Sequence, residues 1–294
     1  MEGFKNTIKT LVEKKMGEGY TISLNNVTKN NGIILTGLSI MEDGCNISPT
    51  IYLDALYAAY EVGQMTEDEV VEDIIRSYER NKTNRQVDMR QFFNYEFVKD
   101  KIVYKLVNKE KNAALLKQVP YIEYLDLAII FNVLISSEKM GQATILIRNE
   151  HCKLWGVDSE QIYKQACLNT PNLMSYTLMR MKDVIEEMMG EIPAEAGDMS
   201  SVPMYVLTNE KKVSGAGCIL YPDLLADFSK AAGSFFILPS SIHEVLLLPT
   251  ESKEDVEEMK LMVQEINRTQ VQDEEVLSDS VYFYDAESNK LSIA

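Results

Sequence analysis

The sequence predicts an α/β or α+β protein, in which a small N-terminal module precedes a larger domain with a mixed sheet flanked by helices. Apolar residues recur every three or four positions in some segments, as in helices, and these segments alternate with short apolar stretches typical of strands. The 294-residue chain is 46% hydrophobic and 25% charged, a balance that excludes disorder over its whole length. No apolar run approaches the roughly 20 residues that span a bilayer.

The chain is predicted to begin with a helix and a hairpin. Phe4, Ile8 and Leu11 share one face of a helix over residues 1–15. Residues 20–27 alternate between apolar and polar, as in a half-buried strand, and residues 33–41 are apolar again. The Asn-Asn-Gly sequence before the second stretch tolerates positive φ, so the two strands are expected to form a β-hairpin.

Two helices are expected to complete an α-β-β-α-α module. The first would open at Ser48-Pro49-Thr50 and run to Ala59. The second follows a capping box at Thr66 to Glu69, in which two side chains satisfy backbone N–H groups reciprocally. Residues 81–90 are polar and are the best candidate for a domain boundary. We therefore expect domains over residues 1–85 and 86–294.

The larger domain is predicted to alternate helices and strands. Its first half is expected to hold a helix near 89–98, a strand over 102–107, a short helix over 113–116, one long strand over 122–135, a partner strand over 142–147, a helix capped by Asp158, and a helix over 178–189. Residues 190–203 are rich in Gly, Pro, Ala and Ser and are expected to be a loop or linker. The second half is expected to hold a strand over 204–207, a helix from Pro222 to Ala232 ended by Gly233, two strands within 235–249, a helix with the apolar stripe Val256, Met259, Val263 and Ile266, and a terminal hairpin of 281–284 with 291–293.

The segment Phe235 to Pro249 holds the best candidate for a functional site. We interpret it as two apolar strands around a Pro-Ser-Ser turn, with His243 and Glu244 embedded in the second strand. Both faces of that strand are otherwise apolar, which indicates a central strand of a sheet covered on both sides. Because a buried polar group is costly without a partner, His243 and Glu244 each require one.

A hydrolytic site here would use Ser241, His243 and Glu244, since a triad needs a nucleophile, a base and an orienting carboxylate. On an extended strand the side chains of Ser241 and His243 would lie roughly 6–7 Å apart, and Glu244 would point to the opposite face. No G-x-S-x-G sequence is present. The three residues are therefore weak catalytic candidates. The alternative is a structural histidine that bonds a neighbouring backbone group or carboxylate.

No metal or cofactor is expected. Cys45, Cys152, Cys167 and Cys218 form no C-x-x-C pair, so neither a zinc site nor a cytosolic disulfide is indicated. His151 is the only other histidine, and a metal site assembled in space from both histidines and a carboxylate stays open. Gly215-Ala216-Gly217 lacks the third glycine and the lysine of nucleotide-binding loops.

The charge of the chain points to a protein partner. The formal net charge is -16, which disfavours binding to nucleic acid, and residues 251–294 carry 12 acids and 4 bases. We expect the helix with the apolar stripe to dock on the sheet and to leave the acids of residues 251–279, among them Glu275, in solvent. This acidic face would steer a basic protein partner, or it would serve solubility alone. No signal peptide or membrane segment is evident, so the expected location is the cytoplasm. The sequence gives no oligomeric state.

Several phrases, among them NNGIILTGLSI, ATILIRNEHCKLWGV, MYVLTNEKKVSGAGCILYP and GSFFILPSSIHEVLLLP, together resemble an uncharacterised family from clostridia, catalogued as domain of unknown function five-six-eight-eight. The resemblance covers most of residues 4–285. It implies a bacterial cytosolic protein encoded on a mobile or accessory element, and it supplies no activity, cofactor or catalytic residue.

Two functions follow from these observations. The absence of a catalytic motif and the acidic C-terminal helix favour a non-enzymatic binding or regulatory module. The alternative is a hydrolase or other enzyme that uses His243 and Glu244 with residues from elsewhere in the fold.

Overall fold

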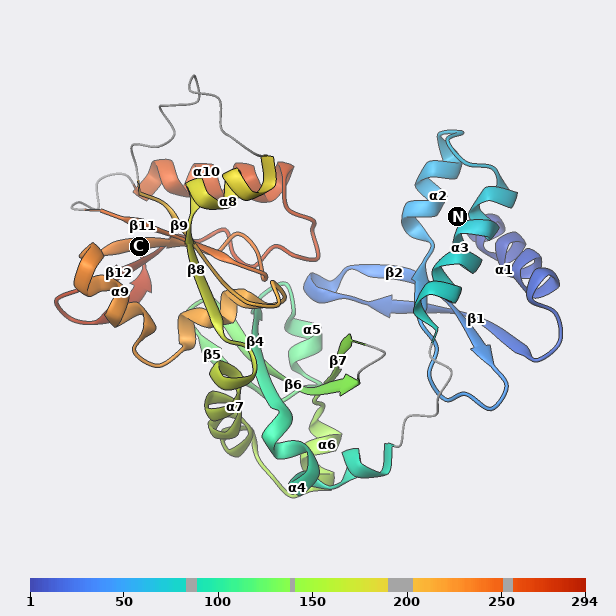
Figure 1. The fold of residues 1–294 in the computed structure, drawn as a ribbon, viewed down its shortest axis with the longest axis horizontal. Coiled ribbons are helices and arrows are strands. Elements are labelled where there is room, and N and C mark those ends of the chain that lie inside the picture. The colour runs from blue at the N-terminus through green and yellow to red at the C-terminus, as the bar shows by residue number, and fades with distance from the viewer. Residues whose placement is uncertain (83–88, 138–140, 190–202, 251–255) are drawn as a thin grey trace. The chain divides into compact units, whose positions relative to one another are not determined.

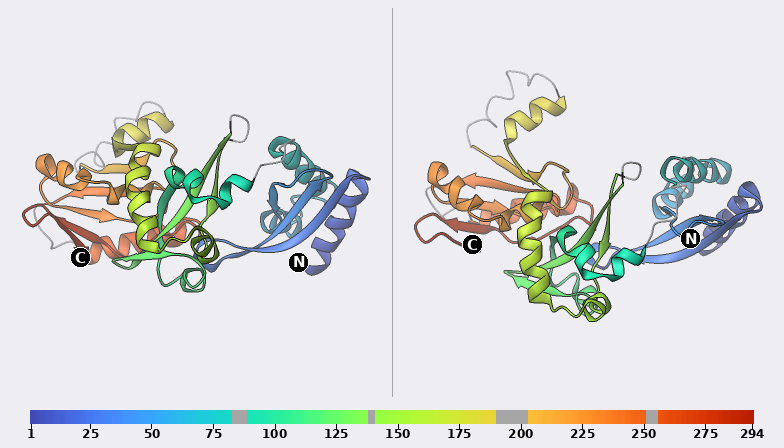
Figure 2. Two further views of the ribbon diagram at one scale, coloured as in Figure 1. Left: turned by 90° about the horizontal axis from the view of Figure 1, so that it is seen from below. Right: turned by 60° about the horizontal axis from the view of Figure 1, so that its bottom comes forward.

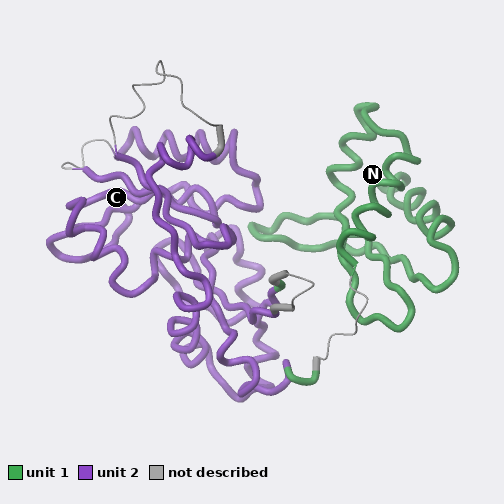
Figure 3. Tube along the Cα trace, viewed as in Figure 1, with its two compact units in different colours: residues 1–91, 136–143 green, residues 92–135, 144–294 purple. Residues whose placement is uncertain are grey.

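The computed structural model describes residues 1–82, 89–137, 141–189, 203–250 and 256–294 (Figure 1). It is an α+β structure in which the sheets are antiparallel, where a mixed sheet was expected. Two compact units make up the chain: residues 1–91 with 136–143, and residues 92–135 with 144–294 (Figure 3). Most of the expected boundary segment, 81–90, lies outside the described residues, so the limits 1–85 and 86–294 stay a prediction. None of the helices in the described ranges is long and apolar enough to cross a membrane.

Residues 1–82 of the first unit form three α-helices, one short 3₁₀ helix, η1 (Asn30–Gly32), and one three-stranded sheet. Its elements are α1 (Glu2–Met16), β1 (Tyr20–Thr28), β2 (Ile34–Glu42), β3 (Thr50–Tyr52), α2 (Asp54–Glu61) and α3 (Glu67–Asn81). β1 and β2 form the predicted antiparallel hairpin, and Asn31 and Gly32 between them have φ of 59° and 71°. The predicted capping box begins α3, since the Thr66 N–H donates to Glu69 Oε2 at 2.8 Å.

The expected helix over residues 48–59 is wrong at its start. Residues 50–52 instead add β3 to the free side of β2, so the unit reads α-β-β-β-α-α. The Ser48 hydroxyl donates to the Ile40 carbonyl at 2.8 Å, which holds this stretch against β2. The helix begins only at Asp54, whose carboxylate accepts the Thr36 N–H at 2.8 Å.

The core of the first unit lies between its helices and its sheet. α1 lies beside the strands in both views of Figure 2. The apolar stripes predicted for α1 and α3 face inward, with Ile8 and Ile74 fully buried. They pack against Leu38 and Ile40 of β2, which are also fully buried.

A four-stranded sheet and its helices come next, and three of these elements extend a few residues into the ranges grouped with the first unit. These elements are η2 (Met89–Phe93), α4 (Tyr95–Val98), η3 (Lys99–Lys101), β4 (Ile102–Asn108), α5 (Ala113–Leu116), β5 (Tyr121–Tyr124), β6 (Leu127–Ser137), β7 (Gly141–Leu146), α6 (Asn149–Trp155) and α7 (Ser159–Leu173). β6 pairs with β4, β5 and β7. The expected helix over 89–98 is broken into short pieces. The long strand expected over 122–135 is two strands, because Leu125 takes a φ of 55° and turns the chain back on itself.

A six-stranded antiparallel sheet forms the rest of the second unit. Its strands are β8 (Tyr176–Arg180), β9 (Tyr205–Asn209), β10 (Phe235–Leu238), β11 (Val245–Pro249), β12 (Tyr282–Asp285) and β13 (Lys290–Ile293), in the order β13-β12-β10-β11-β9-β8. The helices are α8 (Met181–Met189), η5 (Gly215–Leu220), α9 (Leu224–Ala232) and α10 (Val256–Thr269). β11 is a central strand, as predicted. Residues 178–180 were expected to be helical but belong to β8. The linker predicted over 190–203 lies almost entirely outside the described residues.

Helices cover both faces of the six-stranded sheet. Phe228 of α9 packs on the rings of Tyr205 and Phe235, at centroid distances of 5.2 and 4.9 Å. On the opposite face Val263 of α10 packs in one buried cluster with Phe236. The apolar stripe predicted for α10 therefore docks on the sheet.

A carboxylate ties the two sheets of the second unit together. Asp126, in the turn between β5 and β6, accepts hydrogen bonds from the hydroxyls of Ser278, Ser280 and Tyr282 at 2.5, 3.0 and 2.5 Å. Ser278 and Tyr282 are buried. Since all three donors lie at or before β12, the turn of one sheet is fixed to a strand of the other.

Candidate functional site

His243 and Glu244 lie in the connection between β10 and β11, not within a strand as the sequence predicted. The chain does not run straight from the Pro-Ser-Ser turn into β11. Ser241 forms an isolated bridge with Val276, and the Ile242 N–H donates to the Glu275 carbonyl at 2.8 Å. Because Ser241 and Ile242 bond to the segment before β12, strand β11 begins only at Val245.

Both ring nitrogens of His243 are engaged. The backbone N–H of Ser214 donates to Nδ1 at 3.2 Å, and Nε2 lies 3.3 Å from Oε1 of Glu275. A nitrogen that accepts a hydrogen bond carries no proton, so this network places the proton of the neutral ring on Nε2, beside the carboxylate. The ring therefore has no free lone pair with which to act as a base. The two partners are a backbone group and a carboxylate, and the structural role stated as the alternative for this histidine stays a prediction.

Ser241 and Glu244 do not form a triad with the His243 ring. The Ser241 side chain is 5% exposed, and its Oγ accepts the backbone N–H of His243 at 3.0 Å. The carboxylate at the ring belongs to Glu275, which sequence reasoning missed because it is one acid among many in its region. Glu275 was also expected to face solvent with the acidic residues of the C-terminal part, and it instead meets His243. The catalytic role proposed for Ser241, His243 and Glu244 stays a prediction.

Gly215 allows the chain to approach His243 closely. A Cβ atom at this position would lie 2.4 Å from the His243 carbonyl oxygen and 2.2 Å from Oγ1 of Thr208. The same threonine hydroxyl donates to that carbonyl at 2.8 Å. Gly215 opens η5, and it is the first glycine of the Gly-Ala-Gly sequence that lies against the histidine, while Gly217 lies against the ring of Tyr104.

His151 belongs to an aromatic cluster on α6. Its Nδ1 accepts the Arg148 N–H at 3.1 Å, and its ring lies 4.9 Å from Phe92 and 5.7 Å from Trp155. Burial, and to a smaller extent the charge of Arg148, lower the pKa of His151. Among the described residues no three His, Cys, Asp or Glu side chains come together as a metal site would require.

The cysteines are free thiols, and three of them lie in environments that raise the thiol pKa. Burial raises the pKa of Cys218 to about 12, and it also raises the pKa of Cys152 and Cys167. A cysteine reacts as the thiolate, so these environments do not suit a nucleophile.

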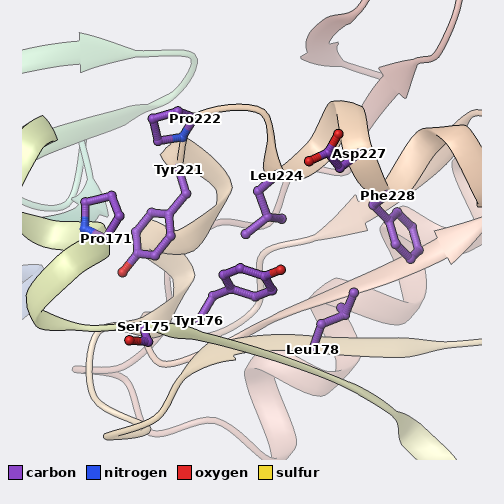
Figure 4. Close-up of a pocket in the computed structure, with 9 residues that line it drawn as sticks. All are labelled: Pro171, Ser175, Tyr176, Leu178, Tyr221, Pro222, Leu224, Asp227 and Phe228. Atoms are coloured by element: carbon purple, nitrogen blue, oxygen red, sulfur yellow. The ribbon is translucent and has the colours of Figure 1, made fainter.

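A pocket of about 580 Å³ lies between β8 and the segment that enters α9 (Figure 4). Its walls are mostly apolar and aromatic, and they consist of Pro171, Ser175, Tyr176, Leu178, Tyr221, Pro222, Leu224, Asp227 and Phe228. The Tyr176 ring lies near the centre of the view, and the residue is 53% exposed.

The polar groups of the pocket are committed elsewhere or exposed. The Tyr221 hydroxyl donates to the Met174 carbonyl at 2.5 Å, and burial raises the pKa of Tyr221. The Asp227 carboxylate lies 2.7 Å from Nζ of Lys230 in the same helix. The pocket therefore presents mainly apolar and aromatic surface.

A model for a family of unknown function, DUF5688, matches residues 1–286. No curated protein and no solved structure matches the chain.

Proposed function

The chain belongs to the DUF5688 family of unknown function, as its sequence resemblance predicted, and from that premise we propose that it is a non-enzymatic binding module of the bacterial cytoplasm. Its ligand is a segment of another protein, and the binding site is the pocket beside β8. The observation that carries this proposal is the composition of the pocket walls.

Those walls suit anchoring apolar side chains of a partner. Binding pockets of about 300–1,000 Å³ take ligands by apolar and aromatic contact, with few polar groups to orient them. Tyr176 and Phe228 present aromatic surface from a strand and a helix, both of which are rigid supports. Aromatic side chains at such positions dominate the affinity of many protein interfaces.

The enzymatic alternative has less support in the geometry. A hydrolase using His243 needs a free imidazole nitrogen, and the backbone of Ser214 and the carboxylate of Glu275 occupy both. Glu244 is half-buried and forms no hydrogen bond or ion pair with any residue in the described ranges.

Charge supports a basic protein as partner. The net charge of -16 attracts basic surfaces at long range and repels phosphate backbones. The described acids of α10 add to this field, because Glu257, Glu258 and Glu265 are exposed. Glu251, Glu254 and Asp255, counted in the same acidic region, lie outside the described residues.

Panning of phage-displayed random dodecapeptides against the full chain tests the proposal. Enriched peptides should bind the purified protein, and Tyr176→Ala should weaken binding at least about tenfold, or ~1.4 kcal/mol, by removing an exposed pocket wall. Leu261→Ala is the matched control, since Leu261 is 68% exposed on α10 over the opposite sheet face. Failure to enrich any peptide, or equal weakening by both variants, contradicts the proposal. So does a mobility shift with DNA or RNA at physiological salt.

A further inference from the structure

The strand that forms one wall of the pocket is also the edge of the six-stranded sheet. β8 pairs with β9 on one side, and no strand in the described part of the chain pairs with its other side. An edge strand presents unpaired backbone N–H and C=O groups, which another chain can use to extend the sheet.

The register shows which backbone groups face outward. The Glu210 N–H donates to the Ser175 carbonyl at 2.9 Å, and the Met181 N–H donates to the Met204 carbonyl at 2.8 Å. In an antiparallel ladder the residues that bond a given neighbour alternate along the strand. Residues 175, 177, 179 and 181 therefore point their backbone groups at β9. Tyr176, Leu178 and Arg180 point theirs at the open edge.

Two of the three outward-facing residues also line the pocket. Tyr176 and Leu178 contribute backbone groups to the edge and side chains to the pocket wall. Residues directly opposite each other on adjacent strands keep their side chains on the same face, about 5 Å apart. A strand added to β8 would thus place the side chains opposite Tyr176 and Leu178 beside the pocket.

We propose that the partner binds by strand addition: an extended segment pairs with the open edge of β8 and inserts two apolar side chains, at positions i and i+2, into the pocket. This inference rests on the proposed function and specifies the class of partner for the same site.

The choice of an extended segment follows from the backbone of β8. Alternate residues offer an N–H and a C=O in the plane of the sheet, and only another extended chain presents complementary groups at that spacing. A helix has already satisfied its own backbone groups and would leave those of β8 unpaired. The pocket volume of about 580 Å³ accommodates more than a single small side chain. The net charge of -16 favours a segment that carries basic residues outside the pocket.

Hydrogen exchange of the complex with a selected peptide provides the first test. The amides of Tyr176, Leu178 and Arg180 should exchange at least about tenfold more slowly when the peptide is bound. The opposite edge gives a matched control. There the Ala294 N–H donates to the Val281 carbonyl at 2.9 Å, so Leu291 and Ile293 of β13 face outward in the same way. Their exchange should not change.

Single N-methylation along the bound peptide provides the second test. N-methylation removes one amide donor, so strand addition predicts that affinity falls at every second position only. The variant Leu178→Pro should also abolish binding, because it removes an outward N–H while leaving the ladder to β9 intact. Leu291→Pro on β13 is its control and should bind as the unaltered chain does.

The outcomes separate this inference from the proposed function. Peptides that need Tyr176 but show no alternation in the N-methyl scan, and no protection of the three amides, overturn strand addition and leave the binding module standing. Failure to select any peptide overturns both. In a further outcome, the three amides are already protected in the free chain, to a degree that rises with protein concentration. That result would assign the edge of β8 to a second copy of the chain and would overturn the assignment of a different partner.

Discussion

The Tyr282 hydroxyl donates a 2.5 Å hydrogen bond to Oδ1 of Asp126. This bond joins β12 of the six-stranded sheet to the turn between β5 and β6 of the four-stranded sheet. Tyr282 is fully buried, and the second oxygen of Asp126 accepts the hydroxyls of Ser278 and Ser280. One carboxylate therefore satisfies three donors from a single segment.

Loss of the Tyr282 hydroxyl and loss of the Asp126 carboxylate should both destabilise the second unit, by different amounts. Tyr282→Phe loses one hydrogen bond to a charged group and should reduce the free energy of unfolding by about 1–2 kcal/mol. Asp126→Ala leaves three hydroxyls without an acceptor and should cost about 3 kcal/mol or more. Urea denaturation measures both. Tyr284→Phe is the control, because its hydroxyl bonds Asn289 in a turn at 3.2 Å, and its effect should stay below about 0.5 kcal/mol. Equal losses from all three variants would contradict a special role for Asp126.

The protein should lose stability in alkaline solution. Burial first, and then the nearby Asp126 carboxylate, raise the pKa of Tyr282 above its usual 10.0. Burial likewise raises the pKa of Tyr104. The folded state thus holds these phenols protonated where the unfolded chain releases the proton. Stability is fully present below pH 10 and falls above it, by up to about 1.4 kcal/mol per pH unit for each tyrosine. Urea midpoints at about pH 9 and about pH 11 check this. In Tyr282→Phe the loss of stability with rising pH should be smaller. An unchanged loss would count against the raised pKa of Tyr282 as its cause.

His243→Ala should destabilise the protein by about 1–3 kcal/mol, because the Ser214 N–H and the Glu275 carboxylate lose their partner and a cavity remains. Glu244→Ala is the matched change at the next position, and it should have little effect. Thermal denaturation of the two variants distinguishes them. A His243→Ala protein with an unchanged midpoint and a lost activity would overturn the structural role of the histidine.

Gly215→Ala should cost more than about 2 kcal/mol. Its Cβ would lie 2.4 Å from a backbone oxygen, and the backbone must shift to relieve that overlap. Gly217→Ala, in the same element, is the control. Its Cβ would approach only the ring edge of Tyr104, at 3.3 Å, so a smaller loss is expected. Denaturant unfolding compares them, and a Gly217→Ala loss as large as that of Gly215→Ala would refute the packing argument.

The protein should fold without metal. No ligand spacing in the sequence calls for zinc, and the described residues bring no three ligating side chains together. Dialysis against a strong chelator should therefore leave the melting temperature unchanged. A large drop that added zinc reverses would reveal a site assembled from distant residues.

Helix ends that are fixed by hydrogen bonds between residues close in the sequence could be predicted from the sequence. The side chains of Thr66 and Asp158 cap α3 and α7 by bonding backbone groups three residues away. The residues that predict each cap therefore lie in the same four-residue segment that forms it. Gly233 ends α9 at a φ of 71°, a conformation that favours glycine.

Other features had no local signal. The turn between β5 and β6 uses Leu125 at positive φ, where a glycine or asparagine is usual, so its sequence looked like a continuous strand. His243 lies outside β11 because residues before β12 bond the connection, which is a long-range effect. The pocket likewise unites residues near Pro171 with residues near Phe228, and no spacing in the sequence relates them.

The hydrogen bonds to Asp126 also make the second unit depend on contacts between residues far apart in the sequence. Asp126 and Tyr282 are 156 positions apart, and Tyr282 also pairs with Ile237 of β10. Closing so long a loop costs entropy before any contact compensates, and folds dominated by such contacts take milliseconds to seconds to form. Until β12 arrives, β10 is itself an uncovered edge of apolar residues. Refolding at high concentration should therefore compete with aggregation through β10.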